Sequence, residues 1–528
     1  MDTVRLDDVA AEVGIDFRHS AFRWGVRGDP NAMMGAGVCW IDVDGDGWLD
    51  LFAVNTWSHG EWGRWYDEGA LPSTALFRND RGRFTDITDE FGARLEIRGN
   101  GCVAADLDLD GHTDLYVTTE RKNLLLWNDG GDRFEEDDGS AGGNSYGWQS
   151  GAAVGDVNGD GWPDLFLAGY ANQNHRIEGA IQGFPNIYGA VADELLLSRG
   201  GEEGRPTFVD VASEAGIEAD RVDYGLGALL TDVDRDGDLD VYVANDTQPN
   251  RLYVNQPSAG ALGFTLVDRA GAAGVNDDGA GMGVAAADYD ADGFPDLVVT
   301  NMTEDLNAVF RSTASGSGEA SPFVAALDDM GLPELGLGDT GWGTTWADLD
   351  LDGDLDLVHA NGMIPVTDLV ADREQLRVFE NDTNGATGTF SEATGIVGLE
   401  VSGRLLGRGL AAADYDNDGD IDLAVGTIGG DLALLRNTGA GGHWLVVDVE
   451  PASPGTRVVV TDTTGRSQER ELLAGSSYLS SEDPRAHFGL GALDGEVTIV
   501  VRWPDGSSVT RSGVEVDQLL RVDRDDAE

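Results

Sequence analysis

Short apolar segments recur along the whole chain, and polar, glycine-rich turns separate them. Seven of these turns are strongly acidic and have an apolar run on each side. In the second of them, Cys102-Val-Ala-Ala105 stands before the turn and Leu115-Tyr-Val-Thr118 follows it. Branched and aromatic residues in such runs favour β-strands, and two runs joined by a tight polar turn are typical of a β-hairpin. The pattern therefore predicts an all-β chain built from hairpins.

The acidic turn is one nonapeptide, Asp-x-Asp-x-Asp-Gly-x-x-Asp. Positions 1, 5 and 9 are Asp and position 6 is Gly in every copy, whereas position 3 is Asp in six copies and Asn158 in the third. The copies begin at Asp42, Asp106, Asp156, Asp232, Asp288, Asp348 and Asp414, and these starts are 64, 50, 76, 56, 60 and 66 residues apart. This regular recurrence predicts a repeat architecture.

The nonapeptide has the chemistry of a calcium-binding loop. Calcium takes about six to eight oxygen ligands in flexible geometry. Carboxylates at positions 1, 3, 5 and 9 would surround the ion, glycine at position 6 permits the bend, and position 7 offers its backbone carbonyl. The sequence thus predicts up to seven Ca²⁺ sites, with these ligands: Asp42, Asp44, Asp46, Trp48 and Asp50; Asp106, Asp108, Asp110, His112 and Asp114; Asp156, Asn158, Asp160, Trp162 and Asp164; Asp232, Asp234, Asp236, Asp238 and Asp240; Asp288, Asp290, Asp292, Phe294 and Asp296; Asp348, Asp350, Asp352, Asp354 and Asp356; Asp414, Asp416, Asp418, Asp420 and Asp422.

Two alternatives compete with this interpretation. An EF-hand needs a bidentate Glu at position 12 and helices on both sides; here position 12 is Ala53, Val117, Leu167, Val243, Val299, His359 or Val425, which excludes it. Asp and Gly also favour tight turns without any metal. Carboxylates crowded into one nonapeptide repel each other unless a cation is present, so the metal-binding interpretation is preferred.

A second pair of strands follows each hairpin. In the first repeat Leu76-Phe-Arg-Asn79 precedes Phe84-Thr-Asp86, and in the fourth Leu252-Tyr-Val-Asn255 precedes Phe264-Thr-Leu-Val267. Four strands in each of seven repeats predict a seven-bladed β-propeller over residues 1–440. The seventh repeat lacks a fourth strand, and residues 4–15 resemble residues 208–217 of the third. We therefore predict that the N-terminal strand completes the last blade and leaves no open sheet edge.

Residues 441–528 follow a different pattern. They contain no nonapeptide, and alternating segments such as His443-Trp-Leu-Val-Val-Asp-Val449 predict further strands. The length suits an independent unit. We expect a small C-terminal β-sandwich-like domain.

Composition narrows the range of partners. The chain has 96 acidic and 34 basic residues and a formal net charge of −62, and the seven nonapeptides hold only 30 of the acids. The surface therefore stays acidic even with seven divalent ions bound. Nucleic acids and anionic membranes require basic patches, so neither is a predicted partner. No apolar stretch is long enough to insert into a membrane.

The cysteines and the N-terminus bear on the compartment. Cys39 and Cys102 stand at different offsets before their nonapeptides, so we expect free buried thiols, although pairing between neighbouring strands is compatible with the pattern. The N-terminus lacks the basic and apolar regions of a secretory signal. The protein is expected to be cytoplasmic if Met1 is the native start and extracellular if a leader was removed.

The connections on the face opposite the calcium turns form a candidate ligand face. Segments 55–75, 170–192 and 361–377 are long, and with adjoining connections they are rich in aromatic and arginine residues, which are common in interaction hot spots and ligand pockets. The alternative is that these side chains pack the interior of the ring. The candidates are Trp57, His59, Trp62, Trp65, Tyr66, Tyr146, Trp148, His175, Tyr188, Arg221, Trp342, Arg404 and Arg408.

These features resemble known families. The nonapeptide repeats resemble the FG-GAP/VCBS repeats of integrin-α-like propellers. The segments Gly475-Ser-Ser-Tyr-Leu-Ser480, Asp483-Pro-Arg-Ala-His-Phe-Gly-Leu-Gly491 and Arg502-Trp-Pro-Asp-Gly506 resemble an ASPIC/UnbV domain. The combination is similar to the cartilage acidic protein family and its bacterial relatives. The polar segment usual after the first tail strand of that family is shortened here to Pro451-Ala-Ser-Pro-Gly455.

The resemblance implies calcium at the nonapeptides and a binding or scaffolding role. The ligand could be a protein, a glycan or a small molecule. Some bacterial relatives are encoded with enediyne biosynthesis genes, so the alternative is a calcium-dependent enzyme or accessory protein of a natural-product pathway, with a pocket at the propeller mouth or the propeller–tail junction. Signatures of catalysis are weak, since the seven histidines show no zinc-ligand spacing. We therefore favour the binding module.

Overall fold

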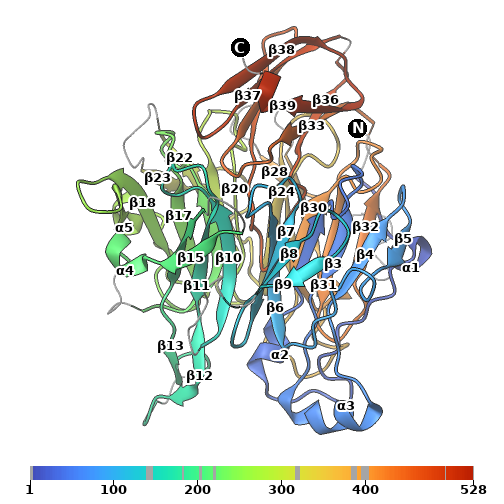
Figure 1. Cartoon of the computed structure of the whole chain (residues 1–528), viewed down its shortest axis with the longest axis vertical. Helices are drawn as coiled ribbons and strands as arrows, with labels where there is room; N and C mark the ends of the chain where they lie inside the picture. The colour runs from blue at the N-terminus through green and yellow to red at the C-terminus, as the bar shows by residue number, and fades with distance from the viewer. Residues whose placement is uncertain are drawn as a thin grey trace.

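The computed structural model describes residues 4–526 apart from 138, 140–146, 181–182, 201–204, 218–221, 315–321, 382–388, 394–403, 440 and 494. Within these residues seven four-stranded antiparallel sheets stand side by side in a ring, and a smaller β-rich tail lies at one end of it (Figure 1). The predicted all-β class is confirmed. Tyr146 and Arg221 of the candidate ligand face lie outside the described residues.

The strands of each blade are named here in order from the centre of the ring outwards. Blade 1 has β2 (Val38–Ile41), β3 (Asp50–Ala53), β4 (Ala75–Asn79) and β5 (Phe84–Asp86); blade 2 has β6 (Gly99–Ala105), β7 (Asp114–Thr119), β8 (Leu124–Asn128) and β9 (Phe134–Glu136). Blade 3 has β10 (Gln149–Gly155), β11 (Asp164–Gly169), β14 (Glu194–Arg199) and β15 (Thr207–Asp210); blade 4 has β16 (Gly225–Thr231), β17 (Asp240–Asn245), β18 (Arg251–Pro257) and β19 (Phe264–Asp268). Blade 5 has β20 (Val284–Ala287), β21 (Asp296–Val299), β22 (Ala308–Ser312) and β23 (Phe323–Ala325); blade 6 has β24 (Gly341–Ala347), β25 (Asp356–Asn361), β27 (Arg377–Asn381) and β28 (Phe390–Glu392). Blade 7 has β30 (Gly407–Ala413), β31 (Asp422–Thr427), β32 (Ala433–Asn437) and β1 (Leu6–Asp8).

The ring is closed by the N-terminal strand. Strand β1 pairs antiparallel with β32, with Leu6 opposite Asn437 and Asp8 opposite Leu435. The innermost strands contact their neighbours in one continuous cycle, from β2 through β6, β10, β16, β20, β24 and β30 back to β2. Closure removes the open sheet edges that would otherwise pair with other chains.

Apolar packing holds neighbouring blades together. Among the described residues, seven hydrophobic clusters each draw their members from two adjacent blades. The cluster between blades 7 and 1, for example, joins Trp40 of β2 to Tyr415, whose rings stack 6.2 Å apart between centroids. Successive side chains point to opposite faces of a strand, so the continuous apolar runs of the inner strands fill the core on both sides of each blade.

Every nonapeptide is a hairpin loop. Its ninth residue is the first residue of the second strand in all seven blades, from Asp50 in β3 to Asp422 in β31. Strands on both sides of the loop rule out an EF-hand in the structure too. Position 6 takes a left-handed conformation, with φ of +85° at Gly47, and glycine adopts this conformation without strain.

Cys39 and Cys102 form a disulfide between β2 and β6, with their Cα atoms 6.2 Å apart. The prediction of free thiols is wrong. The two residues lie on neighbouring innermost strands, and a one-residue difference in offset stays within the Cα separation of about 4.4–6.8 Å that disulfides span.

The tail is a two-layer β-sandwich. One sheet has the order β36 (Ala486–Gly491), β33 (His443–Glu450) and β39 (Gln518–Asp523); the other has β35 (Ser467–Glu471), β34 (Arg457–Thr461), β37 (Val497–Arg502) and β38 (Ser508–Val514). A single cluster that includes Val447, Phe488, Val458 and Ile499 fills the space between them. Strand β33 pairs in parallel with β39 and antiparallel with β36.

The segment between β35 and β36, residues 474–483, inserts into the centre of the propeller; we call it the plug. Its backbone bonds to innermost strands: Val154 N donates to Ala474 O at 2.9 Å, Ser477 N to Val284 O at 2.8 Å, and Trp40 N to Ser481 O at 3.0 Å. Cys102 N and Thr344 N also bond to plug atoms. Glycines make room for it, since a Cβ on Gly37 would lie 2.1 Å from Leu479 O.

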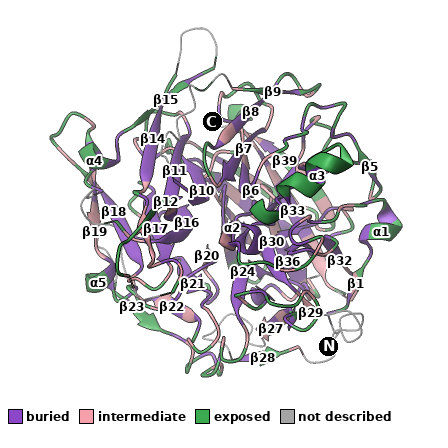
Figure 2. Ribbon diagram, turned by 90° about the horizontal axis from the view of Figure 1, so that it is seen from below, coloured by how far each residue is buried: buried purple, intermediate pink, exposed green. Residues whose placement is uncertain are grey.

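Short helices and two small sheets complete the propeller part and the tail. The helices are α1 (Ala10–Val13), α2 (Pro30–Met34), α3 (Trp62–Glu68), α4 (Ala212–Ala215) and α5 (Ala270–Ala273), with 3₁₀ turns η1 (His59–Glu61) and η2 (Arg524–Asp526). Two small sheets pair β12 (Ala171–Arg176) with β13 (Tyr188–Ala190) and β26 (Glu374–Gln375) with β29 (Arg404–Leu405). Seen from below, α2 lies near the middle of the ring (Figure 2). No helix within the described ranges has the length and hydrophobicity that a membrane span needs.

Candidate metal centres and the opposite face

The first residue of each nonapeptide organises the loop. In the first loop Asp42 accepts two backbone N–H groups, from Asp46 at 3.1 Å and from Gly47 at 2.9 Å. Asp46, at position 5, accepts the N–H of Trp48 at 2.9 Å. The same pattern recurs in the other loops, for example at Asp288, which accepts from Asp292 and Gly293. Local hydrogen bonds therefore curl the loop so that its carboxylates turn inwards.

The ninth residue connects the loop to the rest of its blade. Asp50 accepts the N–H of Val43 at 3.0 Å and the N–H of Asn79, the last residue of the third strand, at 2.7 Å. Asp114, Asp164 and Asp240 make the same pair of contacts, one with position 2 of their own loop and one with their own third strand. The loop is thus fixed in place by its own carboxylate.

Asparagines at or near the ends of third strands join one loop to the next. The side-chain amide of Asn79 donates to Leu49 O of its own loop and to Tyr415 O of the loop of blade 7. Corresponding bonds run from Asn128 to Val43 O, from Asn255 to Val157 O, and from Asn437 to Leu349 O. We call these four residues the asparagine clamps. The carbonyl that each clamp holds belongs to position 2 of the neighbouring loop.

Positions 1, 3 and 9 come together. In at least five loops one carboxylate oxygen from each of these positions lies within 4.8 Å of the other two: Asp42, Asp44 and Asp50; Asp106, Asp108 and Asp114; Asp232, Asp234 and Asp240; Asp288, Asp290 and Asp296; Asp348, Asp350 and Asp356. The carboxylates of position 5 are not part of these groups. Three convergent hard oxygens are the start of a coordination sphere for a divalent cation.

Several carboxylate oxygens in these loops are buried and lack a hydrogen-bond donor, which shows whether a cation would suit the site. The position-3 residues Asp44, Asp234, Asp290 and Asp416 each have one buried carboxylate oxygen with no hydrogen-bond donor among the described residues, and so do Asp348 at position 1 and Asp422 at position 9. A buried carboxylate oxygen without a donor costs free energy unless a cation or a proton compensates it. The donor set, all oxygen, fits calcium.

The electrostatics of these buried carboxylates favour a bound cation. Burial raises the pKa of Asp50, Asp114 and Asp164 to about 8, because desolvation outweighs their backbone hydrogen bonds. Burial also raises the pKa of Asp348 and Asp414, at position 1, to about 8, with neighbouring carboxylates adding to the shift. Protein groups alone therefore leave these acids partly protonated near neutral pH.

The third loop differs from the others at position 3. Asn158 replaces Asp there, and its side-chain amide donates to Asp160 at 3.0 Å instead of offering a carboxylate. Ligand charge tunes calcium affinity in oxygen-lined loops. This loop is therefore expected to be the weakest of the seven.

Exchanging the position-3 residue should move metal affinity in a predictable direction. Asn158→Asp should strengthen binding at the third loop about tenfold, since it adds a carboxylate to the coordination sphere. Asp44→Asn in the first loop should weaken one site by a similar factor. Calcium titration followed by isothermal calorimetry measures both, and equal weak-site affinities in wild type and Asn158→Asp would contradict the assignment.

The tail contacts three of the loops directly. Arg466 donates to Asp352 O at 3.0 Å and to the carboxylate of Asp354 at 2.5 Å. Arg485 donates to Asp414 O at 2.9 Å. Glu471 accepts the N–H of Asp232 at 3.2 Å and pairs with Arg235. The tail thus lies over part of the face that carries the nonapeptides.

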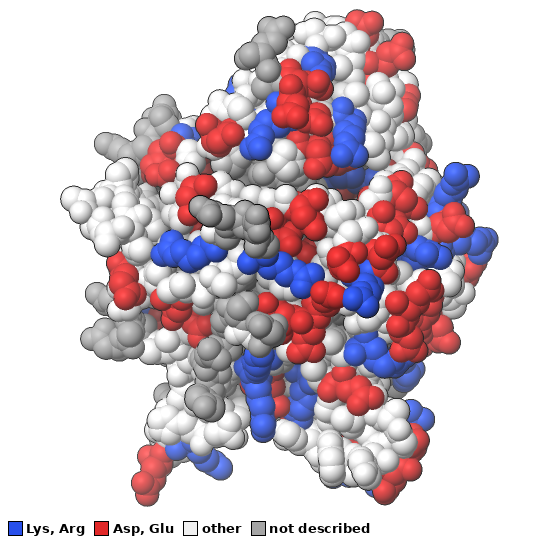
Figure 3. Space-filling view, in the orientation of Figure 1, with Lys and Arg blue, Asp and Glu red and all other residues white. Residues whose placement is uncertain are grey.

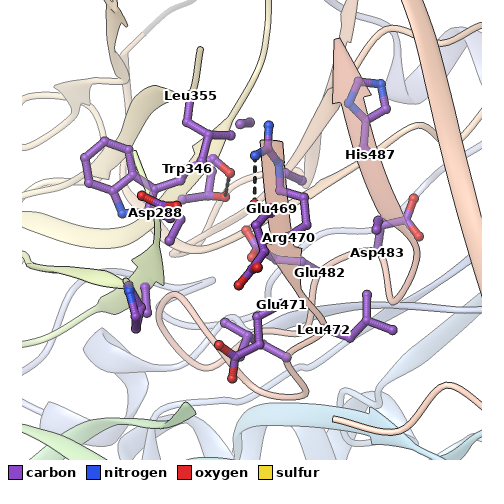
Figure 4. Close-up of a pocket in the computed structure, with 18 of the residues that line it drawn as sticks. Asp288, Trp346, Leu355, Glu469, Arg470, Glu471, Leu472, Glu482, Asp483 and His487 are labelled. Carbon is purple, nitrogen blue, oxygen red and sulfur yellow. Dashed lines mark hydrogen bonds between the residues drawn. The ribbon is translucent and has the colours of Figure 1, made fainter. Parts of the chain in front are cut away.

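A cavity of about 140 Å³ lies at this propeller–tail junction (Figure 4). The tail contributes Arg470, Glu471 and Glu482, and the propeller contributes Asp288 and Asp348. Burial raises the pKa of Glu482 to about 7, and Ser476 Oγ donates to its carboxylate at 2.9 Å. The volume corresponds to a few water molecules, at about 30 Å³ each.

Several residues of the candidate ligand face are interior. Trp57, Trp65, Trp148, Trp342 and Arg408 are all buried, so the expectation that they form an exposed surface does not hold. Trp148 and Trp342 belong to a cluster that also contains Tyr478 and Leu479 of the plug and Met33 and Met34 of α2. Arg408 donates to the carbonyls of Met33, Gly362, Gly407 and Met363, and its guanidinium lies 3.9 Å from the ring centroid of Trp342. These side chains fill the lower part of the ring.

Other members of that face are accessible. Trp62 and Tyr66 are 52% and 70% exposed, and their rings stack on α3 with centroids 5.6 Å apart. His59, His175 and Arg404 are exposed and Tyr188 is half-buried. Helix α3 lies at the end of the molecule away from the tail (Figure 1), and the space-filling view shows mainly uncharged atoms over that lobe (Figure 3).

Two functional elements were not predicted from the sequence. The asparagine clamps lie at or near the ends of third strands, which the sequence pattern does identify. The recurrence of Asn at this place in the repeats was a usable signal for them. The plug coincides with Gly475-Ser-Ser-Tyr-Leu-Ser480, which was recognised only as a family segment. Its position inside the ring has no signal in the local sequence.

Comparison with known families assigns both parts of the chain. The FG-GAP-like repeat model matches residues 42–117, 106–167, 232–299 and 288–359, and the ASPIC and UnbV model matches residues 450–528. The FG-GAP-like matches lie on the nonapeptide hairpins of blades 1–3 and 4–6. The ASPIC and UnbV match covers the tail, including the plug.

Relatives and a solved structure extend this comparison. Cartilage acidic protein 1 of Mus musculus is 28% identical over 462 residues, which cover 81% of this chain and 66% of that protein. The Homo sapiens protein is 28% identical over 457 residues, covering 81% and 64%, so the chain spans about two thirds of the length of these relatives. An Agrocybe aegerita lectin structure aligns with a TM-score of 0.39 and 18% identity over 68% of this chain and 80% of that chain, a likeness too weak to inform function. The chain is a protein of FG-GAP-like repeats followed by an ASPIC and UnbV domain, and its homologues include cartilage acidic protein 1.

Proposed function

We propose that this protein is a calcium-stabilised interaction module that recognises its ligand on the face opposite the nonapeptide loops. One observation carries the proposal: the tail lies over part of the loop face, where it contacts three of the loops, and the plug fills the centre of the ring. The opposite face then offers a broad surface to a partner. Calcium would be bound by up to seven loops and would hold the blades that position this surface.

The exposed pair on α3 is the best-defined part of that surface. Stacked Trp62 and Tyr66 offer flat apolar rings with polar edges, and such side chains are enriched where proteins bind ligands. Trp65 of the same helix is buried, and Arg23 lies over the rings of Trp24 and Trp65, at 5.4 and 4.9 Å from their centroids. A protein or a glycan would suit the exposed pair.

The compartment that fits this function is oxidising and rich in calcium. The Cys39–Cys102 disulfide is of the kind that persists outside the cytosol. Open loops on extracellular modules have calcium dissociation constants of about 10⁻⁴–10⁻³ M, which match extracellular calcium. We therefore propose that the protein acts outside the cytoplasm.

A second candidate function rests on the junction cavity. Glu482 and Asp348, both with raised pKa values, line a cavity shared by propeller and tail, which is the arrangement expected of a calcium-dependent enzyme or a biosynthetic accessory protein. Its volume of about 140 Å³ lies below the range of about 300–1,000 Å³ typical of ligand pockets. The binding module is therefore preferred.

The double variant Trp62→Ala/Tyr66→Ala tests the ligand face. We expect it to lose at least about tenfold in affinity for the ligands found by screening wild-type protein on glycan and extracellular-matrix-protein arrays in calcium, because truncating an aromatic hot spot costs about 2 kcal/mol or more. Val209→Ala, which trims a residue 46% exposed on the outer strand of blade 3, is the matched control. Equal array binding by wild type and the double variant would refute this face.

A further inference from the structure

A second cavity, of about 440 Å³, lies between the fourth nonapeptide loop and the tail. Loop residues between 232 and 239 line one side of it, and Gly455, Arg457 and the turn between β37 and β38, residues 502–508, line the other. Within the described part of the chain it shares no lining residue with the junction cavity around Glu482. Its volume is within the range of about 300–1,000 Å³ typical of ligand pockets.

Two arginines stand next to each other on the wall that the tail contributes. Strand β34 pairs antiparallel with β37, and in this register Arg457 is directly opposite Arg502. Cross-strand partners project from the same face of a sheet, with Cβ atoms about 4.5–5.5 Å apart, and like charges in such a pair repel each other. The two guanidinium groups therefore favour a negative charge beside them.

The pair has no carboxylate partner among the described residues. There, neither guanidinium makes an ion pair or a hydrogen bond, and Arg502 is exposed while Arg457 is half-buried, so both can contact a ligand from solvent. Glu471 is opposite Arg457 on β35, yet it pairs with Arg235 at 3.0 Å instead. Ser508, opposite Arg502 on β38, carries no charge. In a chain with 96 acidic and 34 basic residues, two adjacent unpaired arginines at one cavity are an exception.

The three carboxylates that line the cavity have partners of their own. Asp505 pairs with Arg524 at 3.3 Å. Asp232 accepts the N–H groups of Asp236 and Gly237 at 3.0 and 3.1 Å. Asp232 and Asp236 are also predicted calcium ligands, and a divalent ion in the loop would offset their two charges. In the calcium-loaded protein the arginine pair is then the uncompensated charge of the lining.

The chemistry of the pair favours a carboxylate ligand. A guanidinium donates two parallel N–H bonds to the oxygens of a carboxylate or a phosphate. The formal net charge of −62 repels anions at long range, and this repulsion grows with the charge of the ligand. A single carboxylate therefore costs less to bring in than a phosphate or a polyanion. Pro504, which is exposed beside the arginines, adds apolar surface for the rest of a small ligand.

We propose that the cavity between the fourth loop and the tail binds the carboxylate group of a small ligand, with Arg457 and Arg502 donating to its oxygens. This site goes beyond the proposed function, because it lies on the loop face and shares no residue with the Trp62/Tyr66 surface. It also gives a role to residues 502–506, which the sequence analysis identified only by family resemblance.

Saturation-transfer NMR on the calcium-loaded protein tests this site. The probes are benzoate and glucuronate, each with a neutral counterpart, benzamide and glucose, and phenyl phosphate as a dianion. We expect saturable binding of at least one carboxylate, with its neutral counterpart weaker by at least about tenfold, since hydrogen bonds between charged groups are the strong ones. Phenyl phosphate should bind more weakly than benzoate.

Arginine variants locate the binding. Arg457→Gln and Arg502→Gln should each weaken carboxylate binding by at least about tenfold, because each removes one of the two charged donors. Arg521→Gln is the matched control: it removes an arginine of the other tail sheet, which pairs with Glu450 at 2.8 Å, and should leave the affinity unchanged.

Ser508 provides a second test that keeps both arginines, should their variants fold poorly. Ser508→Asp places a carboxylate opposite Arg502 and should abolish carboxylate binding, whereas Ser508→Asn should retain it. No saturable binding of either carboxylate, equal binding of the neutral counterparts, tighter binding of phenyl phosphate, or unchanged affinity in the arginine and Ser508→Asp variants would overturn the site. Trp62→Ala/Tyr66→Ala should keep full carboxylate binding, so failure of the opposite face leaves this site standing.

Discussion

Excess chelator should lower the melting temperature of this protein by about 10 °C or more. A site occupied at ten times its dissociation constant stabilises the folded state by about 1.4 kcal/mol, and several such sites act on one ring. Removing the ions also leaves buried carboxylate oxygens of residues such as Asp44 and Asp234 without a hydrogen-bond donor among the residues that the structure describes. Scanning calorimetry with calcium and with chelator measures the difference. Superimposable melts would contradict metal binding at the loops.

The drop in melting temperature that chelator causes should be larger at higher pH. Burial raises the pKa of Asp50 and Asp114 to about 8, against about 3.9 for an unfolded Asp. Between these values the metal-free folded state binds more protons than the unfolded state, so its stability falls as pH rises from about 4 to about 8. Calcium replaces those protons. The chelator-induced drop in melting temperature should therefore be larger at pH 8 than at pH 5.5, and a drop of equal size at both would count against the buried carboxylates as ligands.

Tyr478→Ala should destabilise the protein by about 3–5 kcal/mol, the range for removing a buried aromatic side chain. Tyr478 is fully buried, lies 4.9 Å from Trp342 between ring centroids, and donates its hydroxyl to Met34 O at 2.9 Å. The change empties the centre of the ring where blades and tail meet. Urea unfolding gives the free energy, and limited proteolysis should cut the plug, residues 474–483, sooner than in wild type.

Tyr478→Phe is the matched control, because it keeps the ring and loses only the hydrogen bond to Met34. Its cost should be about 1 kcal/mol. If both variants unfold like wild type, the plug does not hold the tail in the propeller. If both lose the same large amount, the hydroxyl rather than the packing carries the stability.

The repeat itself made most of the fold predictable. The nonapeptide fixes the hairpin loop, its ninth residue starts the second strand, and the resemblance of residues 4–15 to residues 208–217 led to the closing strand β1. These features depend on local turn chemistry and on strand periodicity. Both can be recognised from short stretches of consecutive residues.

The positions of single side chains were less predictable. The sequence pattern places Trp148, Trp342 and Arg408 in connections, yet Trp342 lies in β24 and Arg408 in β30, and all three are buried near the plug and α2. These two segments are remote in the chain. The disulfide between Cys39 and Cys102 likewise depends on which strands become neighbours in the ring, which the spacing of the two cysteines does not reveal.

Helix α3 carries side chains that are exposed as expected, on an element that was not predicted. Segment 55–75 was identified as a long aromatic connection, but its short helix, which brings Trp62 and Tyr66 onto one side, was not predicted. Residues four apart share a helix face, so the spacing of Trp62 and Tyr66 was a usable signal. The tail strands β36 and β39 were missed as strands because turn residues and charges interrupt their alternation.

Three of the asparagine clamps join the nonapeptide loops of blades 6, 7, 1 and 2 into one continuous arc. Asn128 ties the second loop to the first, Asn79 the first to the seventh, and Asn437 the seventh to the sixth. An ion that tightens one loop therefore stiffens the backbone of its neighbour before that neighbour is filled. Occupancy along this arc should rise with a Hill coefficient above one, and replacing Asn79 with Ala should return the two flanking sites to independent filling.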